Sequence, residues 1–318
     1  MDPLPVGRED VERAAEVIAG RLHRTPTLSC RTLGPDVFLK AELFQRTGSF
    51  KPRGVLNRLA ALTTHEKVSG IVTWSAGNHA QAVAYGSALE GLDCLVVMSR
   101  GANPAKVAAT RGYGAEVDLE AANHEEAYER LLEVIDTTGR TFVHPFDDPL
   151  VIAGQGTIGL EILEDVPEPD VVVVPVGGGG LVSGIAIAIK EERPGTRVVG
   201  VEPVASNALS AALAAGEVVW VESHTIADGL GPPFAGELPL AICRERVDEV
   251  VLVTEDEIAA GFRFLYERAK LACEPAGAAA VAALLAGKVR LEPGSPVVAV
   301  VSGGNADSQM AADILAGR

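Results

Sequence analysis

The sequence has few cysteines, only four among its 318 residues. Cys30, Cys94, Cys243 and Cys273 lie far apart, without the Cys-x-x-Cys spacing or the neighbouring histidines of a zinc site. This scarcity argues against a disulfide framework and against a structural zinc site. We expect all four thiols to be reduced side chains in the hydrophobic core.

Long apolar runs are absent as well. No stretch reaches the roughly 18 apolar residues that a membrane-spanning helix needs. The first residues, MDPLP, have neither the basic segment nor the apolar segment of a signal peptide. We therefore expect a cytoplasmic protein that has no membrane partner.

Basic residues are scarce relative to acidic ones. The chain has 27 lysines and arginines against 43 aspartates and glutamates, a net charge of -16. Because nucleic-acid binding needs a basic surface that displaces counterions from phosphates, this balance argues against a nucleic-acid partner. An anionic ligand would have to be attracted by local dipoles, such as the N–H groups at a helix start.

What the sequence does contain is a regular alternation of short β-branched segments with helical patterns. Strands are predicted at residues 37–43, 70–74, 94–98, 115–117, 141–143, 170–176, 198–201, 250–253 and 297–301. Helices are predicted at 11–19, 78–89, 104–110, 124–136, 157–163, 181–191 and 207–215, after Pro275, and through residue 265 from a capping box of Thr254 with Glu257. This alternation predicts an α/β fold with parallel-rich twisted sheets flanked by helices. In such folds ligands bind beyond the carboxyl ends of strands. Residues 222–239, rich in Gly and Pro, are predicted to form a long ordered loop near a site.

One lysine occupies an unusual position, in the segment TGSFKPRG at residues 47–54. Pro52 suits the first turn of a helix, so a helix over residues 53–62 is predicted to begin directly after Lys51. An amine beside the positive end of a helix and against Phe50 is discouraged from carrying its charge, and a neutral amine can form an imine. The alternative is that Lys51 is a solvated surface group, as most lysines are.

Four consecutive glycines separate a predicted buried strand from a predicted helix: Gly177, Gly178, Gly179 and Gly180. Their N–H groups can close around a phosphate at the positive helix end. One alternative is a tight turn, although four glycines exceed what a turn requires. A dinucleotide site is another, because Glu202 ends the next strand where a ribose-binding acid is expected. Val182 or Ser183 occupies the third glycine position of that motif, which weakens the dinucleotide alternative.

Two further strand ends carry small and polar residues. The first comprises Ser75, Ala76, Gly77, Asn78 and His79, whose N–H and hydroxyl donors can bind a carboxylate. The second, SGGN at residues 302–305, offers the hydroxyl of Ser302 to a ring nitrogen. The alternative is helix capping, by Ser75 or Asn78 in the first loop and by Asn305 in the second. His79 and His144 show no pairing with a Ser or Cys nucleophile, and we interpret the histidines as structural.

Six motifs together resemble a known family. They are SFK with RG at 49–54, SAGNHAQ at 75–81, HPFDDP at 144–149, GGGG at 177–180, EPAGA at 274–278 and SGGN at 302–305. In this order they resemble the pyridoxal phosphate-dependent threonine dehydratase and serine racemase family, which has the tryptophan synthase β-like fold (fold type II). The resemblance covers nearly the whole chain.

The resemblance implies a role for each loop. Lys51 would hold pyridoxal 5'-phosphate as a Schiff base, Phe50 would pack against its ring, and Asn78 would hydrogen-bond its 3-hydroxyl. The phosphate would be cradled by Gly177, Gly178, Gly179, Gly180 and Leu181. Ser302 would face the pyridine nitrogen, and Ser75, Ala76, Gly77, Asn78 and His79 would bind the substrate carboxylate.

The resemblance also implies a reaction, the β-elimination of water from L-threonine or L-serine with Lys51 as base, which gives a 2-oxo acid and ammonia. Racemases of the family carry a serine as proton donor where this chain has Ala76, so dehydration is favoured over racemisation. Members with a divalent-metal site carry a second acidic residue at the position of Ala208. No metal is therefore expected at Glu202.

We predict a large cofactor-binding domain, residues 1–68 and 141–318, and a small domain, residues 69–140, with the cofactor between them. The predicted function is an L-threonine/L-serine dehydratase that acts on a small amino-acid substrate. The enzyme alternatives are a serine racemase or a dehydratase of another β-hydroxy amino acid such as 3-hydroxyaspartate. The alternative outside enzymes is a dinucleotide-binding protein. A homodimer is expected from the resemblance alone.

Overall fold

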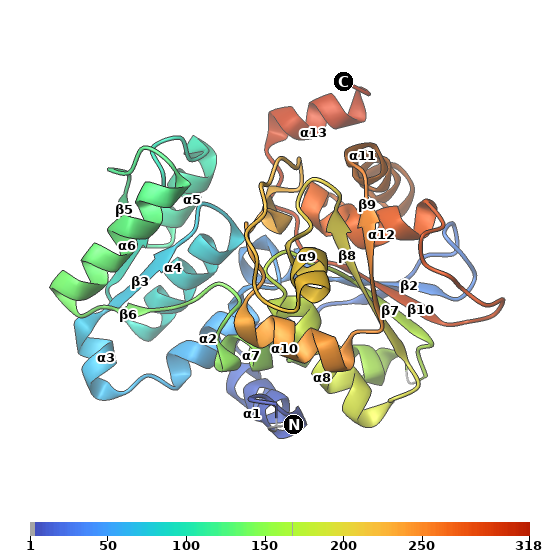
Figure 1. Cartoon of the computed structure of the whole chain (residues 1–318), viewed down its shortest axis with the longest axis horizontal. Coiled ribbons are helices and arrows are strands. Elements are labelled where there is room, and N and C mark those ends of the chain that lie inside the picture. Colours follow the sequence, from blue (N-terminus) through green and yellow to red (C-terminus); the bar gives the residue numbers. More distant parts are fainter. Residues whose placement is uncertain (1–3, 167) are drawn as a thin grey trace.

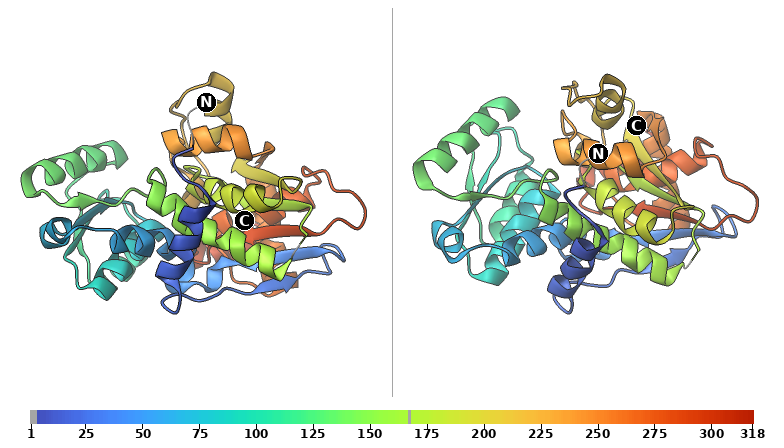
Figure 2. Two further views of the ribbon diagram at one scale, coloured as in Figure 1. Left: turned by 90° about the horizontal axis from the view of Figure 1, so that it is seen from below. Right: turned by 60° about the horizontal axis from the view of Figure 1, so that its bottom comes forward.

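Two β-sheets, each covered by helices, lie at opposite ends of the long axis of the molecule (Figure 1). The structure is a computed structural model that describes residues 4–166 and 168–318. Two further views keep the same separation of the two sheets (Figure 2). Strands and helices alternate along most of the chain, and all neighbouring strands but one pair are parallel. The predicted α/β fold is confirmed.

The larger sheet has six strands in the order β1-β2-β10-β7-β8-β9. Their bounds are Thr27–Ser29, Val37–Ala41, Val297–Val301, Val171–Pro175, Arg197–Pro203 and Glu249–Val253, respectively. Only β1 runs antiparallel to its neighbour. All residues of β7 are buried, because Val171 and Val173 face one layer of helices while Val172 and Val174 face the other. An apolar run without alternation is typical of such a doubly covered parallel strand.

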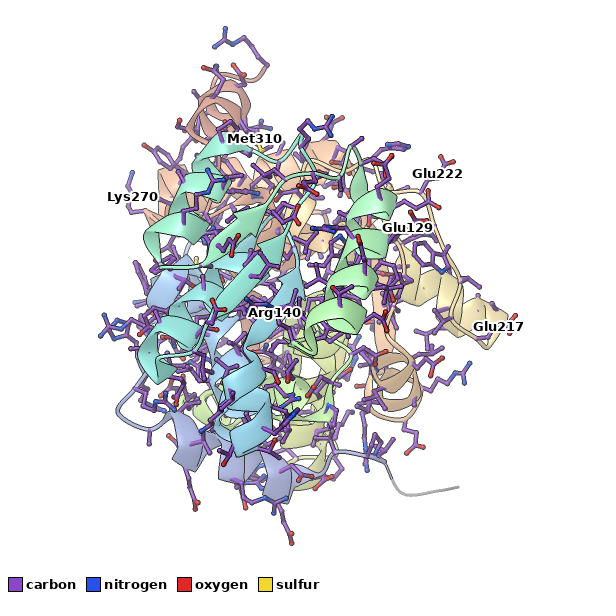
Figure 3. The ribbon with its side chains drawn as sticks, turned by 90° about the vertical axis from the view of Figure 1, so that its left-hand side faces the viewer. Glu129, Arg140, Glu217, Glu222, Lys270 and Met310 are labelled. Atoms are coloured by element: carbon purple, nitrogen blue, oxygen red, sulfur yellow. The ribbon has the colours of Figure 1, made fainter. Side chains whose placement is uncertain are left out.

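The smaller sheet has four parallel strands in the order β5-β4-β3-β6. Their bounds are Glu116–Asp118, Cys94–Val97, Ile71–Trp74 and Thr141–Phe142. The helices around it are α3 (Thr64–Ser69), α4 (Asn78–Glu90), α5 (Pro104–Gly112) and α6 (His124–Thr138). Side chains of α4 and α5 fill one face of the sheet, and those of α6 fill the other. Figure 3 looks at the molecule from this side, with α6 and its Glu129 in the foreground.

Helices cover both faces of the six-stranded sheet. One face packs against α11 (Glu255–Phe264), α12 (Pro275–Leu285) and α13 (Ser308–Leu315). The other packs against α7 (Pro149–Asp165), α8 (Gly180–Glu192), α9 (Ala208–Ala215) and α10 (Glu237–Arg246). The opening helix α1 (Arg8–Ile18) packs on the outside of α7 and α8. Both faces therefore have a continuous apolar core.

Helix α2 (Pro52–Ala60) connects the two parts of the molecule. Its Val55 and Leu59 belong to the core of the four-stranded sheet, whereas its other side lies against α7. A Cβ atom on Gly154 of α7 would come within 2.5 Å of the carbonyl oxygen of Arg53, so only glycine fits at this contact. The amide of Asn57 donates to the carbonyl oxygen of Leu150 at 2.8 Å. The start of α2 is thus fixed from both sides.

A buried ionic cluster also holds the start of α2. The side chain of Arg53 is fully buried, and its guanidinium donates to both oxygens of Glu42, at 2.8 and 2.9 Å, and to both oxygens of Glu161, at 2.7 and 2.9 Å. The amine of Lys40 also contacts Glu161, at 2.6 Å. Burial opposes the charge of Arg53, but the two carboxylates outweigh it and raise its pKa. Arg53 therefore stays charged inside the protein.

Two α-helices and one strand of the described residues have no counterpart in the sequence predictions: α3, α10 and β1. The segment predicted as loop to residue 239 ends earlier, because α10 begins at Glu237. Its first N–H groups are capped by Asp147, which accepts from Glu237 and Leu238 at 3.0 Å each. A cap that comes from so far along the chain leaves no local signal in the sequence.

Helix α7 begins at Pro149, well before the predicted start at residue 157. Asp148 caps it by accepting from the N–H groups of Leu150 and Val151 at 2.8 and 3.1 Å. Most residues of α7 are buried on all sides, so its sequence lacks the apolar and polar periodicity on which helix prediction depends.

The four cysteines are buried and free, as predicted. Among the residues that the structure describes, no helix is long and apolar enough to cross a membrane. The predicted lack of a signal peptide concerns the first residues of the chain, of which 1–3 lie outside the described residues.

Replacing Arg53 should show how much the ionic cluster contributes to the fold. We expect Arg53→Met to lower the free energy of unfolding by about 3–5 kcal/mol, because Glu42 would remain buried without its partner. The measurement is urea-induced unfolding. Arg13→Met is the control, since its side chain is 63% exposed and pairs with Asp10 on the surface; it should cost less than about 1 kcal/mol. Equal losses in the two variants would contradict this account.

Candidate active site

A cavity of about 290 Å³ lies beyond the carboxyl ends of β3, β7 and β10. Small-molecule sites are commonly of this order of size. Its lining includes every residue that the sequence predicted for the site: Phe50, Lys51, Ser75, Ala76, Gly77, Asn78, His79, Gly177, Gly178, Gly179, Gly180, Leu181 and Ser302. These residues come from strand ends of both sheets, so the fold brings together segments that are far apart in the sequence.

Lys51 stands directly before α2 as its N-cap residue, and Pro52 is the first residue of the helix, as predicted. Its amine donates to the carbonyl oxygen of Pro145 at 2.8 Å and lies 5.2 Å from the centre of the Phe50 ring. Lys51 forms no ion pair among the described residues. Burial lowers its pKa from 10.5 to about 8, although the charge of Glu274 opposes the shift. A sizeable fraction of the amine is therefore neutral near physiological pH.

The glycine loop leads from β7 into α8. Gly179 is the N-cap residue, with φ +92°, and no side chain caps the first turn of α8. The N–H groups of that turn are therefore free of side-chain acceptors and can bind an anion. The number of glycines has its own explanation. A Cβ atom on Gly178 would overlap the ring of Phe146, and one on Gly180 would lie 2.9 Å from the carbonyl oxygen of Phe146.

The loop after β3 is not a side-chain cap, so the capping alternative is wrong for both Ser75 and Asn78. The N-cap residue of α4 is Gly77, without a side-chain hydrogen bond, and Asn78 is already the first residue of the helix. The hydroxyl of Ser75 accepts from the N–H of Gly77 at 3.2 Å. The amide of Asn78 points across the cavity instead, where it donates to Glu274 at 2.6 Å.

The loop after β10 supports the same amide. The capping alternative is wrong here too, because Asp307 caps α13 and Asn305 does not. The amide of Asn305 donates to Oδ1 of Asn78 at 2.8 Å and to the carbonyl oxygen of Thr47 at 2.7 Å. The side-chain oxygen of Asn78 accepts from Asn305, and one of its amide N–H groups donates to Glu274. The second amide N–H of Asn78 therefore remains as a donor whose direction is fixed. Ser302 lies beside Phe50, whose N–H donates to the carbonyl oxygen of Ser302 at 3.2 Å.

Glu274 is a site residue that the sequence analysis did not assign a role. It lies at the N-cap of α12, lines the cavity and is 3% exposed. Burial and the charge of Asp228 raise its pKa to about 7, although the bond from Asn78 opposes the shift. Its sequence signals were its place before a proline at a helix start, which is also common in ordinary helices, and its position in the motif EPAGA, for which no role was predicted.

Both histidines near the cavity are neutral and bind the backbone. A ring nitrogen of His79 lies 2.9 Å from the carbonyl oxygen of Val143, and burial moves its pKa well below 6.5. Nδ1 of His144 accepts from the N–H of Asp147 at 2.8 Å, and burial lowers its pKa to about 4. These bonds agree with the structural interpretation.

Glu202 lies away from the cavity and holds the start of α9. Its carboxylate is buried and accepts from the N–H groups of Leu209 and Ser210 at 2.7 and 2.9 Å. Burial raises its pKa. It is therefore a packed capping group, with its oxygens already used by the backbone, and offers no ribose site. No group of three His, Cys, Asp or Glu that could hold a metal ion occurs in residues 4–166 and 168–318.

Comparisons with known proteins agree with this geometry. The family of pyridoxal-phosphate dependent enzymes matches residues 18–303. The chain is 46% identical over 311 residues to the catabolic L-threonine dehydratase TdcB of Escherichia coli K12, which covers 96% of this chain and 94% of that protein. The threonine deaminase of T.th. is 42% identical, with a TM-score of 0.89 and coverage of 95% and 99%.

A maize serine racemase is 35% identical, with a TM-score of 0.92 over 98% of this chain and 97% of that one. The family match and these similarities extend over nearly the whole chain, and the lysine and the glycine loop line one cavity within it. The chain therefore belongs to the family of pyridoxal-phosphate dependent enzymes.

Proposed function

We propose that the protein is an L-threonine/L-serine ammonia-lyase, which eliminates water from the amino acid; the released enamine tautomerises to an imine, and one water then hydrolyses this imine to a 2-oxo acid and ammonia. The observation that carries this proposal is a partly buried amine, Lys51, in the same cavity as an uncapped glycine-rich helix start. The similarity to a threonine dehydratase at 46% identity and to a threonine deaminase at 42% identity supports the choice of substrate.

The residues of the cavity fit pyridoxal phosphate on three counts. Lys51 offers a desolvated amine without an ion-pair partner in the described chain, which suits an aldehyde. The N–H groups at the start of α8 have no side-chain acceptor, which suits a phosphate. Phe50 supplies an aromatic surface beside the amine. When bound, the cofactor supplies an electron sink that acidifies the Cα–H bond of the substrate.

The remaining roles belong to the chain itself. We assign the substrate carboxylate to the N–H groups and the hydroxyl of the loop at residues 75–79. Nζ of Lys51 is the base that takes the Cα proton, since its pKa of about 8 leaves it neutral often enough. We assign the remaining N–H of Asn78 to the 3-hydroxyl of the cofactor ring. Ser302 would offer a neutral hydroxyl to the ring nitrogen of the cofactor, which it cannot fully protonate. Negative charge at Cα of the substrate would then be less delocalised, which favours early loss of the β-hydroxyl of the substrate.

Ala76 separates dehydration from racemisation. It lines the cavity and has no proton to give, so a carbanion cannot be reprotonated from its side. This is why we place the protein with the dehydratases although a serine racemase is among its structural relatives. The choice between threonine and 3-hydroxyaspartate depends instead on the charges around the pocket for the β-substituent.

We also propose the organisation expected from the sequence. The two sheets would mark a small domain, residues 69–140, and a large domain, residues 1–68 and 141–318, with the cofactor between them. A homodimer in the cytoplasm is part of the same proposal. Gel filtration with light scattering of the purified protein tests the dimer.

The proposed reaction is tested by assaying the release of 2-oxo acid and ammonia from L-threonine, L-serine, D-serine and threo-3-hydroxyaspartate. Lys51→Ala should lose at least about 10³-fold in kcat, because both the anchoring amine and the base are removed, and its purified protein should lack the visible absorbance of the bound cofactor. Lys67→Ala, on the surface helix α3, is the control and should keep both. A yellow, active Lys51→Ala protein would refute the assignment.

The lowered pKa of Lys51 predicts how cofactor incorporation depends on pH. Only the neutral amine attacks an aldehyde, and its fraction rises with pH through about 8. The initial rate of absorbance gain after adding pyridoxal phosphate to cofactor-free protein should therefore increase with pH and level off above a midpoint near 8. Free N-acetyl-lysine serves as the reference and should keep rising towards its own pKa of about 10.4. Equal midpoints would contradict the burial argument.

A hydroxyl at position 76 should restore the missing proton donor. We expect Ala76→Ser to form D-serine from L-serine at a measurable rate, while the unchanged protein forms little, with the enantiomers separated by chiral chromatography. Ala61→Ser, at the exposed end of α2, should behave like the unchanged protein. If Ala76→Ser dehydrates L-serine but yields no D-serine, residue 76 does not control the outcome.

A further inference from the structure

An ion pair lies at the edge of the active-site cavity. The amine of Lys106 pairs with the carboxylate of Asp228, and both residues line the cavity. Lys106 belongs to α5, beside the four-stranded sheet, whereas Asp228 begins the short helix η3 (Asp228–Leu230), between α9 and α10. The lysine side chain is 17% exposed and the aspartate side chain 51% exposed. The pair therefore joins the two halves of the cavity wall.

Both partners are held in place by their own surroundings. Asn103 caps the start of α5, and its amide donates to Asp307, the N-cap residue of α13, at 2.9 Å. The segment before Asp228 is fixed by Glu255, which accepts from the N–H of Ile226 at 2.7 Å. The positions of the two charges are thus set by the fold and not by the pair alone.

The charges of the cavity are few, and most are committed elsewhere. Among the described lining residues, the charged ones are Lys51, Lys106, Asp228 and Glu274. Lys51 is assigned to the cofactor, and Glu274 is buried against Asn78. Asp228 raises the pKa of Glu274 and Lys106 lowers it, so the fields of both groups reach the interior of the site. The amine of Lys106 is the remaining cation that could meet a substrate side chain.

We propose that Asp228 is a specificity-determining residue: by neutralising Lys106, it keeps the pocket for the β-substituent selective for uncharged hydroxyalkyl groups and against a carboxylate. This rests on the proposed function. A second substrate carboxylate would have to displace Asp228 from the amine, which would leave two carboxylates around one cation in a partly desolvated site. An uncharged side chain, such as that of threonine, leaves the pair intact.

The test removes the charge of Asp228 and keeps its shape. Binding of L-aspartate and of L-2-aminobutyrate to the cofactor-loaded protein is measured by calorimetry. In parallel, kcat/KM is measured for threo-3-hydroxyaspartate and L-threonine. Two ratios are compared: the affinity for L-aspartate over that for L-2-aminobutyrate, and kcat/KM for threo-3-hydroxyaspartate over that for L-threonine. We expect Asp228→Asn to raise both ratios at least about 10-fold, because the amine of Lys106 becomes available to the second carboxylate. The shift should shrink as salt is added.

Two further variants locate the cause. Asp228→Asn combined with Lys106→Met should abolish the gain, since the cation itself is gone. Asp93→Asn removes an equal charge from a side chain that is 69% exposed, pairs with Arg140 and does not line the cavity, and it should leave both ratios unchanged. Ratios for Asp228→Asn within twofold of the unchanged protein, or a gain that survives in the double variant, would overturn the proposal. If the Asp228→Asn protein turns over L-threonine but both ratios are unchanged, only the role of Asp228 is refuted. If the unchanged protein binds neither L-aspartate nor L-2-aminobutyrate, the proposed function is refuted as well.

Discussion

The amine of Lys51 lies in a partly desolvated cavity without a carboxylate partner in the described chain, and much of the surrounding structure maintains this arrangement. A buried ammonium is costly, so burial favours the neutral form and lowers the pKa to about 8. The carbonyl oxygen of Pro145 supplies an acceptor that holds the amine at 2.8 Å in either protonation state. A directly bonded carboxylate would have stabilised the charged form of the amine and reduced the fraction that is neutral.

Such an arrangement needs a rigid base, because a lysine side chain is otherwise flexible. The base is the first turn of α2, which Arg53 ties to Glu42 and Glu161 inside the protein. On the same turn, the N–H of Gly54 donates to Gln155 of α7 at 3.3 Å, and a Cβ at Gly54 would lie 2.6 Å from a backbone oxygen of α7. Charged and close-packed contacts two and three residues from Lys51 therefore fix where its side chain begins. The ionic cluster positions the lysine without touching the cavity.

Part of the fold and of the site could be predicted from the sequence, because it depends on local chemistry. Pro52 marked the start of α2, and the capping box of Thr254 with Glu257 marked the start of α11, which the structure confirms. The strand-end rule led directly to residues that share one cavity. What could not be predicted depends on partners distant in the sequence. Asp147 caps α10 from 90 residues away, and Asn305 reaches Asn78 from 227 residues away.

The glycine loop shows a subtler limit. Its glycines were interpreted as too many for a turn, yet Phe146 occupies the space in which Cβ atoms at Gly178 and Gly180 would stand. The sequence records that glycine is required but not which neighbour requires it. The surroundings of a buried carboxylate cannot be predicted from the sequence either. Glu274 and Glu202 both lie near strand or helix ends, and only the fold shows that Glu274 lines the cavity whereas Glu202 caps α9.

Lys51 and Glu274 are coupled through their charges, which bears on the state of the whole cavity. The ammonium of Lys51 lowers the pKa of Glu274, and the carboxylate of Glu274 raises the pKa of Lys51. When Lys51 is neutral, Glu274 loses that stabilising cation and holds its proton more firmly. The pKa of Glu274, about 7, lies below that of Lys51, about 8, so between these values both groups are ionised and the pair carries no net charge. Lys106 and Asp228 form the other neutral pair at the edge. In a protein with a net charge of -16, this local neutrality allows an anionic cofactor and a zwitterionic substrate to enter the site without opposing a carboxylate field.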